Sequence, residues 1–238
     1  SGKAMTSGNQ NVMIGRGAGE ALTTAERNVY LGITAGGGTS TGNDNVAAGY
    51  GAALNNTGAY NIMFGRYAGT TQTSGSHNVM LGANVAKCHT TGDCNVFIGN
   101  EAGSHVSSSG GTGDGNIGLG CKALTGLTSG SNNTAIGPNN TGCSITTGSG
   151  NVILGDSAGT ALVSGHNNII IGREAGKNVT TTIQKNVIIG YGAGNGVITT
   201  AADGLVAVGS AAGDAVTSAA RITAVGYGAL GAEENNDE

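Results

Sequence analysis

The segment KNVIIGYGAG at residues 185–194 contains a phrase that decides the fold, because the same phrase recurs along the chain. Each copy reads asparagine, a β-branched residue, a variable residue, an apolar residue and glycine. Copies begin at 11, 28, 45, 61, 78, 95, 116, 133, 151, 168 and 186, with two degenerate copies at 205 and 222. These 13 copies are spaced by 16 to 21 residues, most often 17. A fixed period of this kind indicates a repeat architecture with one structural unit per copy.

The spacing of apolar residues favours strands over helices. No window has apolar residues at i, i+3, i+4 and i+7, whereas the second and fourth phrase positions are regularly apolar, as in Val12 and Ile14 or Ile62 and Phe64. Alternate residues of a strand share a face, so we expect these two columns to point into the coil. The sequence therefore predicts an all-β fold, a parallel β-solenoid or β-roll of about 13 coils of about 17 residues.

Asparagine opens 11 of the 13 phrases. Its side chain can close a turn, tolerate a left-handed backbone and stack on the asparagine of the next coil. The glycine that ends each phrase allows a bend where a Cβ would obstruct it. We expect a structural ladder formed by Asn11, Asn28, Asn45, Asn61, Asn78, Asn95, Asn116, Asn133, Asn151, Asn168 and Asn186.

The composition is unusual for a globular enzyme, with 47 glycines in 238 residues, 3% aromatic residues and 10% charged residues. Four of the 14 acidic residues lie in the last six positions, so the rest of the chain is neutral. Without a basic stripe we expect no nucleic-acid partner, and the short apolar runs predict no membrane insertion. We divide the chain into a lead-in at 1–10, a solenoid repeat domain at 11–230 and an acidic tail at 231–238.

The middle phrase position bears on assembly. We expect its side chain to point away from the coil interior, where large apolar residues in eight of 13 copies would form an exposed strip. Coverage by the chain's own loops is the alternative, but those loops are short and polar. Contact between identical chains, as a dimer or a trimer, follows. The residues expected at this interface are Met13, Tyr30, Met63, Met80, Phe97, Ile153, Ile170 and Ile188.

Motifs for catalysis, cofactors and metals are absent from the sequence. His77, His89, His105 and His166 are scattered without metal-ligand spacing, so we expect surface histidines and no metal site. The few carboxylates are dispersed over the repeats. We therefore expect no enzymatic activity and no cofactor.

Cysteines and threonines leave two local questions. Cys88 and Cys94 flank the segment HTTGD and could close it with a disulfide, with free thiols as the alternative. Adjacent threonines such as Thr90 and Thr91 differ from the Thr-x-Thr array of an ice-binding solenoid, and we interpret them as turn residues.

A binding role on a repeat scaffold is expected where the period is broken. The repeat that begins at Asn95 is 21 residues long and inserts SHVSSSGGTGDG at 104–115, and a second break carries Pro138, the only proline. We expect the first loop to contact a cell-surface glycan or receptor, and a tolerated insertion is the alternative. The candidate receptor-loop residues are Ser104, His105, Ser107, Ser108, Ser109, Thr112 and Asp114.

The phrase Asn-Val/Thr-x-Ile/Val-Gly, followed by x-x-Ala-Gly, resembles the repeats of phage tail-fibre shafts and of trimeric autotransporter adhesin heads. SNNTAIG (131–137), KNVIIGYGAG (185–194) and AVGYGAL (224–230) are most similar to the tail-fibre repeats. The resemblance extends from about residue 9 to 230. It implies a left-handed parallel β-roll in a homotrimer.

The resemblance also implies a function. The chain would be a structural fibre segment on a virion surface with a role in host attachment, or an adhesin head on a bacterial surface. A self-assembling extracellular filament is a further alternative, and an ice-binding solenoid agrees less well with the sequence.

Overall fold

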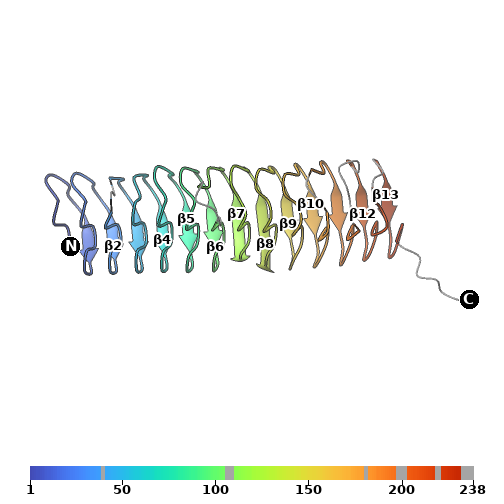
Figure 1. The fold of residues 1–238 in the computed structure, drawn as a ribbon, viewed down its shortest axis with the longest axis horizontal. Helices are drawn as coiled ribbons and strands as arrows, with labels where there is room; N and C mark the ends of the chain where they lie inside the picture. The colour runs from blue at the N-terminus through green and yellow to red at the C-terminus, as the bar shows by residue number, and fades with distance from the viewer. Residues whose placement is uncertain (39–40, 105–109, 180–181, 197–202, 218–220, 232–238) are drawn as a thin grey trace, which may run out of the picture.

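The computed structural model describes residues 1–38, 41–104, 110–179, 182–196, 203–217 and 221–231. The chain is an all-β parallel β-solenoid that runs as a rod from its first coil to its last (Figure 1). In the described ranges, 13 strands form one parallel sheet in chain order. The strands are β1 (Val12–Ile14), β2 (Val29–Leu31), β3 (Val46–Ala48), β4 (Ile62–Phe64), β5 (Val79–Leu81), β6 (Val96–Ile98), β7 (Ile117–Cys121), β8 (Thr134–Asn139), β9 (Val152–Leu154), β10 (Ile169–Ile171), β11 (Val187–Ile189), β12 (Val206–Val208) and β13 (Thr223–Val225).

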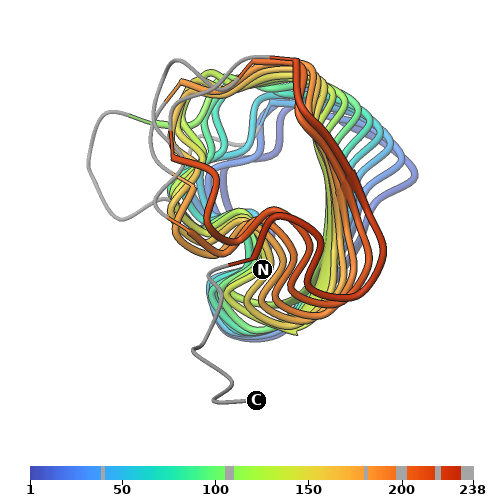
Figure 2. The same cartoon turned by 90° about the vertical axis from the view of Figure 1, so that its right-hand side faces the viewer.

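Equivalent residues of successive coils stack on one another. Ile170 of β10 pairs with Ile153 of β9 and with Ile188 of β11, and the phrase positions of the other strands stack in the same way (Figure 2). The β7–β8 pair has a register shift beyond these positions, between Leu119 and Cys121. In most coils the strand ends before a corner at the glycine of the phrase, whereas β7 and β8 continue past that glycine. At Gly155 φ is 127°, and a Cβ would lie 2.6 Å from the carbonyl oxygen of Gly172 in the next coil. Only glycine permits the coils to stack this closely at that corner.

The asparagines that precede the strands form a hydrogen-bonded ladder inside the rod. The backbone N–H and Nδ2 of Asn78 donate to Oδ1 of Asn61 at 2.9 and 3.1 Å, and Nδ2 also donates to the carbonyl of Gly92 at 2.9 Å. Oδ1 of Asn78 accepts the backbone N–H of Asn95 at 2.8 Å. The ladder residues from Asn28 to Asn186 are fully buried, and Asn11 is partly buried. One side chain thus satisfies buried polar groups of two coils.

The middle phrase position points into the coil, so its expected outward orientation is wrong. Seven of the eight residues expected at the interface, Tyr30, Met63, Met80, Phe97, Ile153, Ile170 and Ile188, are 0% exposed, and Met13 packs partly buried against the same core. The seven fully buried side chains contact only the interior of their own chain, so they cannot form a contact with another chain.

The physical reason is the width of the interior. The opposite wall carries small residues, and the rings of Tyr30 and Phe97 lie directly on Gly36 and Gly103, where a Cβ would be 2.7 Å from the ring. Such a slot accepts one side chain from each three-residue strand. The second and fourth phrase positions therefore face outward, which reverses the expectation for them as well.

The coil also continues into two regions that the sequence set apart. In residues 1–10, the N–H groups of Gly2, Ala4 and Thr6 donate to the carbonyls of Ala18, Glu20 and Thr23 at 2.9 to 3.2 Å, so this lead-in follows the path of a coil. At the second break, Pro138 lies within β8, and Thr141 rather than Asn140 takes the buried position that alanine holds in other coils. The Thr141 hydroxyl donates to the carbonyl of Gly155 at 2.8 Å.

Candidate functional site

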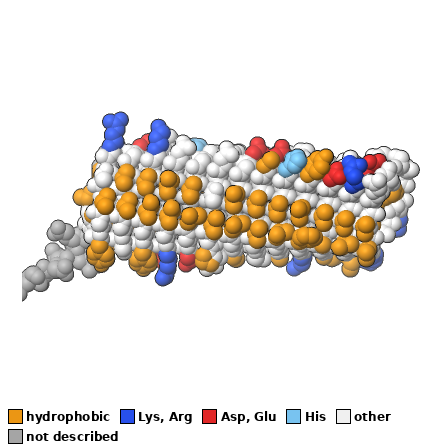
Figure 3. All heavy atoms as spheres, turned by 180° about the vertical axis from the view of Figure 1, so that it is seen from behind, with side chains coloured by type: hydrophobic (Ala, Val, Ile, Leu, Met, Phe, Trp, Pro, Cys, Tyr) orange, Lys and Arg blue, Asp and Glu red, His pale blue; other side chains and the backbone are white. Residues whose placement is uncertain are grey.

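The outer side of the sheet carries a continuous apolar strip. We call it the apolar face and define it as the second and fourth phrase positions of the 13 strands, from Val12 and Ile14 in β1 to Thr223 and Val225 in β13. Figure 3 shows two rows of apolar side chains that run along the rod on this side. Thr134 and Thr223 are the only polar residues in these two columns, which contain no charged residue.

The exposure of the apolar face follows from stacking. In the middle of the rod Ile62, Ile98 and Ile169 are 38 to 39% exposed, because neighbouring coils cover their flanks. At the two ends Ile14 and Val225 are 65% and 66% exposed. The outward side of each side chain thus remains in water along the length of the sheet.

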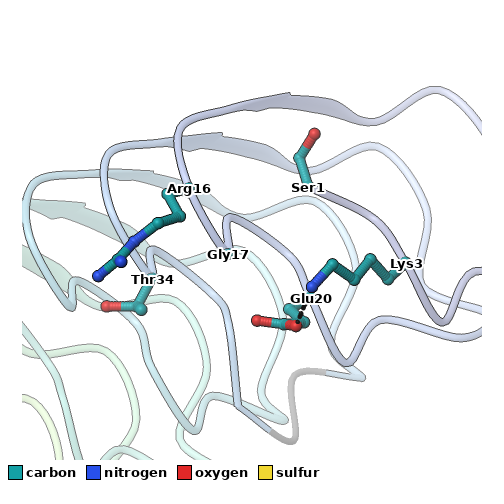
Figure 4. Close-up of a pocket in the computed structure, with 6 residues that line it drawn as sticks. All are labelled: Ser1, Lys3, Arg16, Gly17, Glu20 and Thr34. Atoms are coloured by element: carbon teal, nitrogen blue, oxygen red, sulfur yellow. Dashed lines mark hydrogen bonds and ion pairs between the residues drawn. The ribbon is translucent and has the colours of Figure 1, made fainter.

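A second feature lies at the corner beyond the glycine that ends each strand. An open hollow of about 390 Å³ is lined by six residues, Ser1, Lys3, Arg16, Gly17, Glu20 and Thr34, which Figure 4 shows as sticks. Lys3 Nζ donates to Glu20 Oε1 at 2.8 Å, and this hydrogen bond lowers the pKa of Glu20. Arg16 lines the same hollow with its guanidinium beside Thr34, and no ion pair joins it to a described residue.

The same corner carries aromatic and cationic side chains two to four coils further on. Tyr50 and Tyr67 lie edge to face with ring centroids 5.2 Å apart. The Arg66 guanidinium is 4.9 Å and the Lys87 amine 5.8 Å from the centre of the Tyr67 ring. The Tyr67 ring occupies the space above Gly51, where a Cβ would be 2.8 Å from the ring.

The loop expected to bind a receptor is only partly described. Ser104 is 8% exposed, the N–H of Thr112 donates to the carbonyl of Thr128 at 2.6 Å, and the Asp114 carboxylate accepts the N–H of Asp93 at 2.8 Å. These three residues follow the path of the coil. His105, Ser107, Ser108 and Ser109 lie outside the described residues.

The four cysteines are free thiols in the structure, so the suggested bond between Cys88 and Cys94 is not formed in it. Cys94 is exposed and has a φ of 58°. The residue before the asparagine has the same left-handed conformation in other coils, as at Arg27 and Asp44, so the repeat itself sets the backbone at Cys94.

The histidines occupy different environments. His89 is fully buried, which differs from the surface position expected for it, and its Nε2 lies 3.1 Å from Asn95 Nδ2. His77 stacks on Tyr60 at 4.9 Å, and His166 Nδ1 accepts the N–H of Ser149 at 3.1 Å. In the described part of the chain, no three His, Cys, Asp or Glu side chains are grouped so that they could hold a metal ion.

The threonine hydroxyls are used within the rod. Those of Thr73 and Thr90 donate to the carbonyls of Thr90 and Gly111 in the following coil, both at 3.2 Å. These hydroxyls link successive coils at a turn.

Searches against protein-family profiles, curated proteins and solved structures find no match to this chain. The residues that the structure describes contain no helix with the length and apolar character required to cross a membrane.

Proposed function

We propose that this chain is a non-catalytic structural segment of a homotrimeric fibre at the surface of a virion or a cell, assembled through the apolar face. The observation that supports assembly is the length of this face, which extends over all 13 strands without a charged side chain. Isolated exposed apolar residues are common on monomers, but a contiguous apolar strip of this kind indicates a contact surface.

The size of the apolar face agrees with a specific interface. With strands about 4.8 Å apart, 13 strands extend over about 60 Å, and two outward columns with their side chains are about 10 Å wide. The face therefore offers roughly 600 Å² per chain, so three chains that meet along it would bury about 1,800 Å² in total, an area of the size that specific contacts bury.

Identical chains are the partners that suit this face. A cyclic assembly places every coil at the same height as its own copy, so the apolar columns are matched over their whole length. The resemblance of the repeats to trimeric fibres supports three copies. A long rod with attachment surfaces repeated by symmetry would serve as a spacer and as a multivalent contact to a host or cell surface.

Neighbouring isoleucines that face opposite sides of β10 provide the test. Ile169 is 39% exposed on the apolar face, whereas Ile170 is 0% exposed inside the coil. Ile169→Asp together with Ile62→Asp should preserve the circular dichroism spectrum and weaken association by at least about 100-fold, because the assembly would bury unpaired charges. Ile170→Asp should instead disrupt the coil itself.

Sedimentation equilibrium at micromolar concentration gives the mass. The exposed residue Ser74, which lies outside the apolar face, supplies a control, and Ser74→Asp should keep the mass of the original protein. A trimer that becomes a monomer only in the Ile62→Asp/Ile169→Asp variant supports the proposal. A monomeric original protein, or a double variant of unchanged mass, contradicts it.

A further inference from the structure

The corner of the rod from coil one to coil five joins a hollow to a cluster of aromatic and cationic side chains. We call this surface the Tyr67 ridge and define it by Arg16, Thr34, Tyr50, Arg66, Tyr67 and Lys87. Each of these residues except Lys87 stands one or two positions after the glycine of its phrase. The ridge is therefore separated from the apolar face by that glycine.

The parts of the ridge are contiguous. Thr34 lines the hollow with Arg16, and its Oγ1 lies 4.0 Å from the position that a Cβ on Gly51 would take. The Tyr67 ring lies on the other side of the same position, 2.8 Å from it. A ligand can thus extend from Arg16 along Thr34 to the Tyr67 ring, a distance of about 14 Å for three coil spacings.

The ridge carries positive charge that the chain does not neutralise. Among the described residues, Lys3, Arg27, Lys122, Arg173 and Lys177 are all within 4.0 Å of a carboxylate. Arg16, Arg66 and Lys87 are exposed, and no ion pair with a described carboxylate exists for them. Exposed cations without carboxylate partners favour an anionic ligand.

The aromatic rings specify the rest of the ligand. Tyr50 is 48% exposed and is fixed edge to face against Tyr67, so it presents a rigid apolar surface with a hydroxyl at its end. The C–H face of a sugar ring fits such a surface, and the Thr34 hydroxyl oxygen and the backbone of Gly17, which are both partly exposed, can meet sugar hydroxyls. We propose that the Tyr67 ridge binds an acidic oligosaccharide, with sugar rings on Tyr50 and acid groups at Arg66, Lys87 and Arg16.

The inference rests on the attachment role proposed above. It assigns the contact with a glycan to the Tyr67 ridge, whereas the sequence pointed to the loop at 104–115. It can be tested separately, because one short oligosaccharide needs only one ridge and no assembly. A matched control exists on a later coil. Arg173 lies 5.8 Å from the Tyr191 ring at the same corner, but Asp156 at 4.0 Å and Glu174 at 3.7 Å neutralise it.

Isothermal titration calorimetry with three tetrasaccharides tests the ridge: a galacturonate oligomer that carries carboxylates, a heparin-derived oligomer that carries sulfates, and neutral maltotetraose. At least one acidic probe should bind, maltotetraose should not, and added salt should weaken binding. The stronger acidic probe identifies the acid group. Arg66→Ala/Lys87→Ala should reduce affinity at least about tenfold, and Tyr50→Ala should reduce it about five- to tenfold.

The Arg173→Ala control should change affinity by less than about twofold. Three results would contradict the proposed binding at the Tyr67 ridge. They are binding of maltotetraose as tight as that of the acidic probes, a loss of affinity in Arg173→Ala equal to that in Arg66→Ala/Lys87→Ala, and no binding of either acidic probe. Sedimentation of the same samples separates the two proposals. An intact trimer that does not bind the acidic probes contradicts only the proposed binding at the Tyr67 ridge. A monomeric protein that binds them contradicts only the proposed assembly through the apolar face.

Discussion

Asparagine recurs before the strands because one side chain there satisfies two coils. In Asn78 the amide donates to Asn61 and to the carbonyl of Gly92, while its oxygen accepts the N–H of Asn95. All of these groups are buried, so water could not replace a hydrogen-bond partner that was lost. Leu205 stands at a phrase position where asparagine is missing. Its backbone N–H still donates to Asn186 Oδ1 at 2.7 Å, but its side chain has no oxygen that could accept a hydrogen bond from the next coil.

Asn78→Ala should therefore lower the free energy of unfolding by about 3–5 kcal/mol, because it leaves the Asn95 N–H and the Gly92 carbonyl buried without partners. Urea denaturation measures the loss. Asn100 offers a control, since it is exposed and its Nδ2 donates to the carbonyl of Ala83 at 3.3 Å. Asn100→Ala should cost less than about 0.5 kcal/mol. Equal losses in the two variants would show that the ladder is not what stabilises the coils.

At the scale of the strand, the existence, number and order of the elements could be predicted from the sequence, but not which side faces inward. A three-residue strand such as Ile169–Ile171 is apolar on both faces, so alternation provides no contrast between core and surface. Side-chain size provides a partial signal. In the middle column Tyr30 stacks on Ala47 and Phe97 on Gly118, which is typical of a narrow interior, whereas Ile170 stacks on the isoleucines of both neighbouring strands.

This complementarity predicts coupling between neighbouring strands. A Cβ on Gly118 of β7 would lie 2.9 Å from the Phe97 ring of β6, so Gly118→Ala should destabilise the protein by about 1–3 kcal/mol. In a Phe97→Leu background the smaller side chain should relieve the clash, with a coupling of about 1 kcal/mol in a double-mutant cycle. Thermal and urea unfolding of the four proteins provide the cycle. If Gly118→Ala costs the same in both backgrounds, the two side chains do not share the slot as described.

The whole molecule is a one-dimensional stack in which each coil contacts its neighbours on either side. Stability is then the sum of coil and interface contributions, and coils can be removed in whole units. A half-coil deletion, by contrast, would move inward residues outward and break the asparagine ladder.

Deletion of residues 152–168 joins Asn151 to Ile169. Asn151 then takes the place of Asn168 at the first phrase position, and Ile169 keeps the second position. The shortened chain should fold with an unchanged circular dichroism spectrum and a rod about 5 Å shorter, as measured by small-angle X-ray scattering. Deletion of residues 152–159 alone should yield an unfolded or aggregated protein. A stable rod from the second deletion would contradict the uniform register.

The apolar face and the Tyr67 ridge were less accessible to sequence reasoning than the fold. Once the period is known, Tyr50, Arg66 and Tyr67 fall at the same corner of neighbouring coils. Their contact, however, depends on the missing side chain at Gly51, which makes room for the Tyr67 ring. The positions of side chains at an exposed corner are set by such vacancies in the neighbouring coil and not by the period.

The asparagine ladder also has a direction. In each step the later coil donates its backbone N–H to the amide oxygen of the earlier one, as Asn95 does to Asn78 and Asn78 to Asn61. During synthesis the earlier coil leaves the ribosome first and already presents the acceptor that the next coil requires. Every finished coil is thus a template for the register of its successor, and the chain can fold vectorially at the pace of translation, without waiting for its C-terminal half.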